Sequence, residues 1–254
     1  MSRLTQTSEF EAMRAAGRLV AMAHEAIAEA VKPGVSSKEL DAIAERVIVS
    51  GGGVPAFKGY HGFPATICAS YNEEVVHGIP SRRRLEEGDI ISVDIGAIVD
   101  GYYGDSAWTY AVGRVAPDVQ RLLEVTEQSL MAGLAEARGG LPLRSVSGAV
   151  QDVVEAAGFS VVRDFVGHGI GKNLHESPQI PNFRTAEEGP ILVPGDALAI
   201  EPMVNIGGHQ VKVKKNGWTV VTTDGSWSAH FEHTIIVTEG EPEITTRRSG
   251  VLAL

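Results

Sequence analysis

Four acidic residues lie inside segments that are otherwise apolar. Asp94 is part of IISVDIG, and Asp105 follows it after the turn-rich segment AIVDGYYG. Glu201 lies in LAIEPM, and Glu232 lies in HFEHTIIV. Burying one charge without a partner is expensive, and a single such residue most often accepts hydrogen bonds from its surroundings. Four of them indicate a shared site, because a hairpin would point Asp94 and Asp105 at one spot.

The carboxylates require cations if they converge. Their mutual repulsion would otherwise raise their pKa values until protons neutralised the site. Divalent ions are the less costly solution, since one carboxylate can bridge two metals. His168, in FVGHGIG, adds an imidazole, which favours Mn, Fe, Co or Zn over Mg or Ca. With no set of thiolates available, these ligands indicate a catalytic metal site rather than a structural zinc site.

The other histidines divide into two groups. His175 follows His168 by seven residues in NLHESP, and His77 lies in VVHGIP. We expect the remaining ones to be ordinary packed or surface side chains, and these are His24, His61, His209, His230 and His233. The two-residue alternation of a strand places His230 on the same face as Glu232.

Two helices and a set of strands must position the first carboxylates. The capping box Ser8-x-x-Glu11 opens a helix-period segment that runs to about Val31. A second box, Ser36-x-x-Glu39, opens another segment that ends at three glycines. The β-rich runs TICAS, DIISVDIGAIV and SAWTYAV follow, separated by Gly and Asn turns.

The same order of elements returns in the second half of the chain. Pro117 starts a long helix, and Ser145 opens a short helix that ends near Gly158. Four strand-like runs follow, namely SVVRDFVG, DALAIEPMV, WTVVTTD and FEHTIIVTE.

Two short strings recur in this second half. The string HGI occurs at 77–79 and at 168–170, and GD followed after four residues by an acid occurs at 88–94 and at 195–201. A period near 100 residues is too long for a solenoid repeat. The pattern favours duplicated α+β halves around a pseudo-twofold axis, which would bring equivalent carboxylates together at the centre.

Composition limits the classes of protein that fit. The 254 residues include 22 basic and 32 acidic side chains, for a formal net charge of −10, and 43% are hydrophobic. This is typical of a folded chain, and the acidic balance argues against a protein built mainly to bind nucleic acid. The lone Cys68 excludes an intrachain disulfide, and we find no signal peptide or membrane-spanning apolar run. We therefore expect a cytoplasmic protein without DNA or membrane partners.

The chain resembles the type I methionine aminopeptidases, in a short form, from about Ser8 to Thr238. The resemblance rests on YHGFPATICAS, NEEVVHGIP, DGYYGDSAWT, GHGIGKNLHESP, AIEPM and SAHFEHTIIV, which keep the family's order. It implies an α/β (α+β) pita-bread fold, with an antiparallel sheet covered by helices in pseudo-symmetric halves, at about 8–115 and 116–240 of a single catalytic domain, 1–254. It also implies metal-dependent removal of an N-terminal methionine when the second residue is small.

The resemblance assigns the metal ligands residue by residue. Asp94 would bind one of two divalent ions, either Co, Mn, Fe or Zn. Asp105 and Glu232 would bridge both ions, while His168 and Glu201 would complete the ligands of the second. Glu201 also matches the family's general base.

The resemblance also assigns substrate contacts. His77 and His175 match residues that contact the substrate and count, with Glu201, as catalytic. The methionine side chain would lie in a pocket lined by Tyr60, Phe63, Cys68, Leu174 and Trp218. Leu174 stands where the family has Phe, which changes the pocket's shape and keeps it apolar.

A monovalent cation and several partners complete the expectations. Asn72, Glu74 and Ser228 fall where the family holds Na or K. The substrates would be peptides and nascent chains, and we expect a monomer. The basic segment VKVKKNGW offers a transient contact to the ribosome through Lys212, Lys214 and Lys215.

Three alternatives are less well supported. Prolidases and Xaa-Pro aminopeptidases share the metal ligands but usually carry an extra N-terminal domain, whereas here only a helix precedes the first half. A non-catalytic relative would have broken ligands, and all five are present. Type II enzymes carry a large insertion, for which the 26 residues from His175 to Glu201 leave no room.

Overall fold

The computed structural model describes residues 3–248. Within this range the helices are α1 (Thr7–Ala30), α2 (Ser37–Ser50), α3 (Pro117–Ala135) and α4 (Leu143–Ala156), with a 3-10 turn at Tyr60–Gly62. The strands are β1 (Val54–Pro55), β2 (Ile67–Tyr71), β3 (Glu74–Val76), β4 (Ile90–Val99), β5 (Tyr102–Ala111), β6 (Ser160–Val161), β7 (Gly167–Gly169), β8 (Glu176–Ile180), β9 (Ala197–Ile200), β10 (Met203–Asn205), β11 (Val211–Val213), β12 (Val220–Thr222), β13 (Ser228–His230), β14 (His233–Ile236) and β15 (Glu243–Ile244). None of the helices described here is long and apolar enough to cross a membrane.

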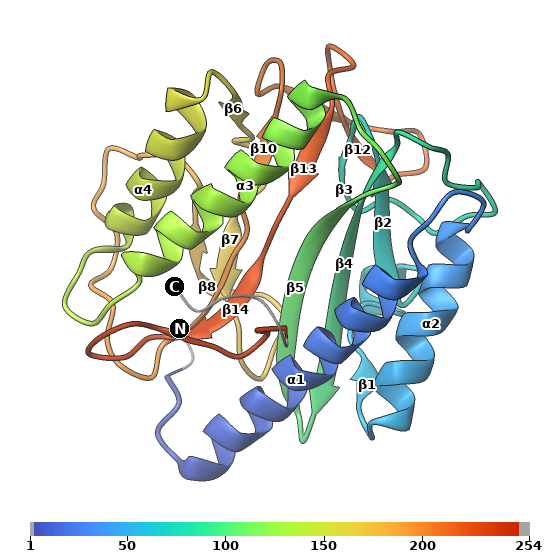
Figure 1. The fold of residues 1–254 in the computed structure, drawn as a ribbon. Coiled ribbons are helices and arrows are strands. Elements are labelled where there is room, and N and C mark those ends of the chain that lie inside the picture. Colours follow the sequence, from blue (N-terminus) through green and yellow to red (C-terminus); the bar gives the residue numbers. More distant parts are fainter. Residues whose placement is uncertain (1–2, 249–254) are drawn as a thin grey trace.

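All pairings between these strands are antiparallel. The longest pairing joins β4 to β5 and forms the predicted hairpin. Strands β1 and β2 also pair with β4. A second sheet has the order β15-β14-β9-β7-β8, and two smaller ones have the orders β13-β10-β6 and β11-β12-β3. Helices and antiparallel sheets in this arrangement confirm the α+β class. Figure 1 shows the β4–β5 hairpin beside β13 and β14.

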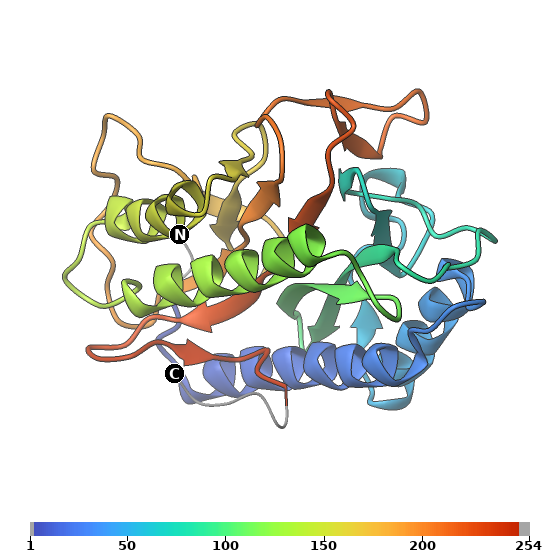
Figure 2. The same ribbon diagram turned by 45° about the horizontal axis from the view of Figure 1, so that its top comes forward.

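The helices cover the sheets and bury their apolar faces. Helix α1 packs against β4, β5 and α2, and α3 packs against α4, β10 and β13. Figure 2 shows α1 and α3 lying across one side of the sheets. The apolar side of α1 faces the core, where Met13, Leu19, Val20 and Ile27 are buried and Phe10 is partly buried.

The predicted helix starts are partly right. Ser36 and Glu39 form the expected capping box of α2, because the Ser36 N–H donates to Glu39 Oε2 (2.8 Å) and the Glu39 N–H donates to Ser36 Oγ (3.3 Å). The box predicted at Ser8 is wrong. Helix α1 begins at Thr7, so Glu9 receives the N–H groups of the preceding turn, including that of Gln6 (3.1 Å).

Three predicted strands are interrupted. The run SVVRDFVG forms only β6 at its start and reaches β7 at its last residue. The other two interruptions hold a key carboxylate. The run DALAIEPMV consists of β9 and β10, with Glu201 and Pro202 between them. Pro202 has no N–H to donate to a neighbouring strand. Likewise β13 ends at His230 and β14 starts at His233, so that Glu232 lies between strands. The expectation of continuous strands through Glu201 and Glu232 is therefore wrong.

Three buried side-chain hydroxyls join the β4–β5 hairpin to the segment 230–234. We call Ser106, Thr109 and Thr234 the hydroxyl seam. The hydrogen bonds run from Ser106 Oγ to Glu232 O (2.6 Å), from Thr109 Oγ1 to His230 O (2.9 Å) and from Thr234 Oγ1 to Asp105 O (2.7 Å). The backbone that carries Asp105 is thus fixed directly to the backbone that carries Glu232.

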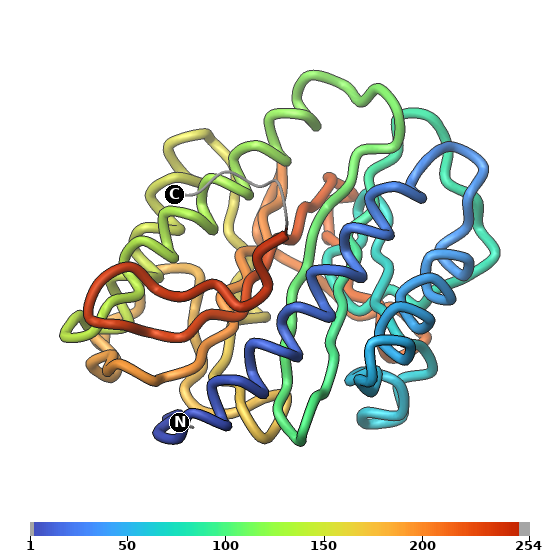
Figure 3. Tube along the Cα trace, turned by 60° about the horizontal axis from the view of Figure 1, so that its bottom comes forward, coloured from blue at the N-terminus to red at the C-terminus, as the bar shows by residue number. Residues whose placement is uncertain are grey.

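Helix α1 is held tightly against β5 and the C-terminal segment. A Cβ added at Gly104 would lie 2.7 Å from the Gly17 backbone nitrogen, so only glycine permits this approach. Arg14 Nε lies 2.6 Å from Oε1 of Glu243, the first residue of β15. Figure 3 shows the C-terminal hairpin reaching α1. These contacts fix the outer side of the strand that carries Asp105.

His24 anchors α1 to β5 from inside the core. Its side chain is buried, with Nε2 2.9 Å from Ser106 O and Nδ1 2.9 Å from the Tyr110 hydroxyl. A carbonyl oxygen only accepts, so Nε2 carries the hydrogen of the neutral ring. Burial lowers the pKa of His24 to about 3. The prediction that His24 is an ordinary packed histidine agrees with this position.

Candidate metal centre and active site

The hairpin places the two aspartates on one face of their sheet. Asp94 pairs with Ala107 and Asp105 pairs with Gly96, so the two side chains are diagonal neighbours. Such neighbours on one face are within reach of each other. The hairpin that was predicted to bring Asp94 and Asp105 together is therefore confirmed.

His168 brings a nitrogen lone pair to the same place. Its Nδ1 lies 3.0 Å from the Gly169 carbonyl oxygen, which can only accept a hydrogen bond. Nδ1 therefore carries the hydrogen, and Nε2 presents its lone pair. Nε2 lies 3.5 Å from Glu201 Oε1. Neither His168 Nε2 nor an ionised Glu201 carboxylate carries a hydrogen, so the two atoms cannot hydrogen-bond to each other. Their closeness fits a cation bound between them.

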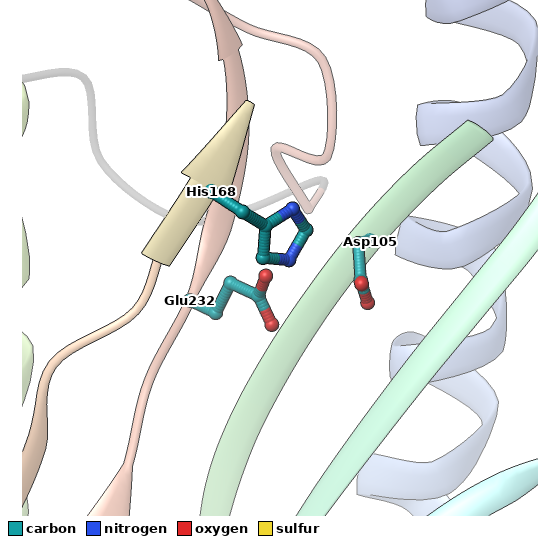
Figure 4. A group of neighbouring side chains, drawn as sticks. All are labelled: Asp105, His168 and Glu232. Atoms are coloured by element: carbon teal, nitrogen blue, oxygen red, sulfur yellow. The ribbon is translucent and has the colours of Figure 1, made fainter. Parts of the chain in front are cut away.

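Asp105, His168 and Glu232 form a compact group of possible metal ligands. One ligand atom from each lies within 4.8 Å of the others, and all three side chains are buried. Figure 4 shows them converging from β5, from β7 and from the segment between β13 and β14. The Glu232 backbone is fixed by its N–H, which donates to Ala107 O (2.8 Å).

The carboxylates are poorly satisfied by the protein itself. Burial, followed by the charge of Asp94, raises the pKa of Asp105, and burial followed by Asp105 raises that of Glu232. Burial also raises the pKa of Glu201, and it raises that of Asp94 to about 6. Asp94 Oδ1, Asp105 Oδ1 and Glu232 Oε1 have no hydrogen-bond partner. Buried oxygens of this kind fit divalent cations, which would supply the missing positive charge.

A cavity of about 280 Å³ gathers the predicted site residues. Every residue that we predicted as a metal ligand, catalytic group or part of the methionine pocket lines it, namely Tyr60, Phe63, Cys68, His77, Asp94, Asp105, His168, Leu174, His175, Glu201, Trp218 and Glu232. Phe57 and His61 also line the cavity and were missed. His61 adjoins Tyr60 in the motif YHGF, which was the available signal.

Two histidines of the cavity lie beside the carboxylates without belonging to the compact ligand group. The Tyr60 hydroxyl lies 2.9 Å from His175 Nδ1, and the rings of His175 and His168 are 4.4 Å apart between centroids. Burial, followed by the nearby His61, lowers the pKa of His175. Burial, followed by the neighbouring imidazoles, lowers the pKa of His77 to about 4. Both rings are therefore neutral near pH 7.

The apolar part of the cavity is built from aromatic and aliphatic side chains. Phe63 and Trp218 meet edge to face with centroids 5.1 Å apart. Leu174 is buried, so the residue that replaces the family's Phe still contributes to the wall. Cys68 pairs with Asp94 in the sheet, and burial raises the pKa of its thiol.

The three residues expected near a monovalent cation lie together outside this cavity. The Ser228 N–H donates to Asn72 O (2.9 Å), and Ser228 Oγ is buried without a partner. Glu74 Oε1 accepts from Lys214 Nζ (2.6 Å). The Glu74 carboxylate is thus already paired with a cation of the protein, whereas the Ser228 hydroxyl oxygen is left for an added ion.

The fold and the site together define a metal-dependent hydrolase, since activating water is the chemistry that such ligands serve. The chain belongs to the metallopeptidase family M24, whose model matches residues 11–239.

The chain is similar to methionine aminopeptidases along nearly its whole length. The chain is 57% identical over 239 residues to methionine aminopeptidase 1 of Bacillus subtilis (strain 168), covering 94% of this chain and 96% of that one. It is 46% identical to the methionine aminopeptidase of Escherichia coli (strain K12), covering 94% and 92%. The crystal structure of methionine aminopeptidase from Thermotoga maritima matches with a TM-score of 0.95 and 45% identity, covering 98% and 100%. The resemblance found in the sequence is confirmed.

A more distant match concerns the fold alone. The prolidase from Pyrococcus furiosus has a TM-score of 0.79 at 20% identity, covering 97% of this chain and 66% of the prolidase. Together with the Thermotoga maritima structure, it confirms the predicted pita-bread arrangement.

Proposed function

We propose that the protein removes the N-terminal methionine from peptides and nascent chains when the second residue is small. The observation that carries this proposal is the group of Asp105, His168 and Glu232 in the wall of a largely apolar cavity. Further support comes from methionine aminopeptidases that the chain matches over nearly their whole length.

The proposal includes two divalent ions, Co, Mn, Fe or Zn, held by the five predicted ligands. These ligands are Asp94, Asp105, His168, Glu201 and Glu232. The unpartnered carboxylate oxygens support their role. When bound, the ions supply Lewis acidity to the scissile carbonyl and lower the pKa of water.

The protein's own groups position the substrate and move its protons. Burial raises the pKa of Glu201, which suits a carboxylate that takes a proton from water and passes it to the leaving amine. His77 and His175 are neutral imidazoles, and each can donate an N–H to the carbonyl oxygen on which charge develops. The hydrogen bond from Tyr60 fixes the orientation of His175.

The apolar wall accounts for methionine as the preferred first residue. A flexible thioether packs well against aromatic edges, and Phe63 and Trp218 present such edges. Leu174 leaves more room than Phe would, so we expect tolerance of slightly bulkier first residues.

Several finer expectations belong to the same proposal. The protein would act as a cytoplasmic monomer, with pseudo-symmetric halves at about 8–115 and 116–240. Backbone oxygens near Asn72, Glu74 and Ser228 would hold Na or K. Ribosome contact would use the exposed Lys212 and Lys215 more than Lys214, which is paired with Glu74. Replacing these lysines with Glu should weaken salt-sensitive co-sedimentation with ribosomes, and unchanged co-sedimentation would argue against this contact.

Release of methionine from Met-Ala-Ser tests the main proposal. The metal-loaded protein should cleave this peptide and leave Ala-Pro peptides intact, whereas the reverse preference would support a prolidase. Asp105→Asn should abolish both cleavage and metal content by elemental analysis. Asp164→Asn, which makes the same change at an exposed position, should alter neither. Full activity of Asp105→Asn would refute the assigned site.

A further inference from the structure

One buried nitrogen beside the metal centre has no partner. His230 ends β13 and is 2% exposed, and its Nε2 makes no hydrogen bond within residues 3–248. Glu201 Oε2 lies 3.6 Å from it. A buried polar group without a partner is costly, and a small movement would close this gap to a hydrogen bond.

The Glu201 carboxylate lies between two imidazoles that have different roles. His168 Nε2 lies 3.5 Å from Oε1, and its hydrogen-free nitrogen cannot donate to that oxygen. Oε1 therefore lies on the side where a cation fits. His230 approaches the other oxygen, Oε2. A hydrogen-bond donor at Oε2 would fix the orientation of the carboxylate and leave Oε1 free to bind the cation.

The strands give His230 a fixed position for this contact. It pairs directly with Met203 in the β10–β13 ladder, and Glu201 precedes Met203 by two residues. The His230 backbone is held on both sides by Thr109, whose Oγ1 accepts from the His230 N–H (2.9 Å) and donates to its carbonyl (2.9 Å). The imidazole therefore extends toward Glu201 from a rigid backbone.

The two imidazoles approach different oxygens of Glu201. His168 Nε2 faces Oε1 and belongs to the compact ligand group, whereas His230 Nε2 faces Oε2. We propose that His230 is a positioning residue, whose Nε2–H donates to Glu201 Oε2 and orients the carboxylate for metal binding and proton transfer. This inference rests on the proposed metallopeptidase function.

The expected effect of replacing His230 follows from the role of groups that hydrogen-bond to metal ligands. Losing a group that orients a ligand typically reduces metal affinity or activity 10–100-fold. His230→Leu removes the donor and keeps an apolar side chain of moderate size. His230→Gln keeps an N–H donor, so it should restore most of the loss. His209→Leu, outside the cavity, is the matched control.

The test measures Mn²⁺ affinity by calorimetry and peptide cleavage by steady-state kinetics. We expect His230→Leu to weaken Mn²⁺ binding about 10–100-fold and to lower kcat more than it changes KM. A crystal structure with Mn²⁺ should show Nε2 within about 2.7–3.2 Å of Glu201 Oε2. His230→Met serves as a second apolar variant if His230→Leu does not fold.

Two results would overturn the inference. One is Mn²⁺ affinity and kcat of His230→Leu equal to those of the wild type. The other is Nε2 within about 2.0–2.2 Å of the metal, which would make His230 a ligand. If the wild type binds Mn²⁺ but releases no methionine, the proposed function fails, while calorimetry and the crystal structure still decide the role of His230.

Discussion

The buried His24 makes folding stability sensitive to acid in a defined pH range. Its pKa is about 3 in the folded protein, against an ordinary value of 6.5, because burial disfavours the charged ring. Below pH 6.5 this residue binds a proton in the unfolded chain but stays neutral in the folded chain. The contribution of His24 to the free energy of unfolding is therefore fully present above pH 6.5 and is lost as the pH falls toward 3.

The size of the effect follows from the two pKa values. One pKa unit corresponds to about 1.4 kcal/mol, so the full loss below pH 3 is at most about 5 kcal/mol. Between pH 7 and pH 5 linkage gives about 2 kcal/mol. His24→Gln keeps a polar side chain without this titration, so its stability should depend less on pH by that amount.

Urea unfolding at pH 7 and pH 5 measures this difference. Both proteins are studied with a chelator, which removes the pH dependence of metal binding. His24→Gln also loses packing, but that loss is the same at both pH values and cancels. The difference in free energy of unfolding between wild type and variant should change by roughly 2 kcal/mol from pH 7 to pH 5. An unchanged difference would refute the conclusion that folded His24 is buried and neutral.

Three other perturbations test the site and the packing that supports it. Glu232→Gln should lose bound metal, by elemental analysis, and lower kcat/KM by at least about 100-fold, since it removes a ligand rather than an outer partner; retained metal would contradict its role. Tyr60→Phe should lower kcat about fivefold, for a hydrogen bond of about 1 kcal/mol, with metal content unchanged; a normal kcat would show that His175 needs no orienting bond. Gly104→Ala should cost about 1–3 kcal/mol in thermal unfolding, because its Cβ would meet the Gly17 backbone; an unchanged melting temperature would refute this contact.

The composition of the site could be predicted because its residues violate local patterns. Asp94 and Asp105 are charges in apolar strands joined by a short turn, and such charges need partners wherever the strands lie. The cavity then contained each pocket and ligand residue taken from the family motifs. The second helix start was predictable for a similar reason, since the Ser36 box is purely local.

Features that depend on distant segments could not be predicted. Glu201 and Glu232 lie at strand interruptions, which arise where β9 and β14 part from the β10–β13 pair. Periodicity showed only apolar runs there. His230 was assigned an ordinary packed position, because its approach to Glu201 depends on the pairing register of two short strands. The first helix start was misplaced by two residues, since local sequence offered two acidic residues, Glu9 and Glu11.

The hydroxyl seam gives the metal centre a mechanical role. Asp94 and Asp105 lie on one side of the seam, while His168, Glu201 and Glu232 lie on the other. Ions bound there would cross-link the two segments, in addition to the three hydroxyl hydrogen bonds. A motion that separates the segments would require the metal to dissociate, so higher metal occupancy should make the seam more rigid. Slower hydrogen exchange at the seam on metal loading would reveal this cross-link.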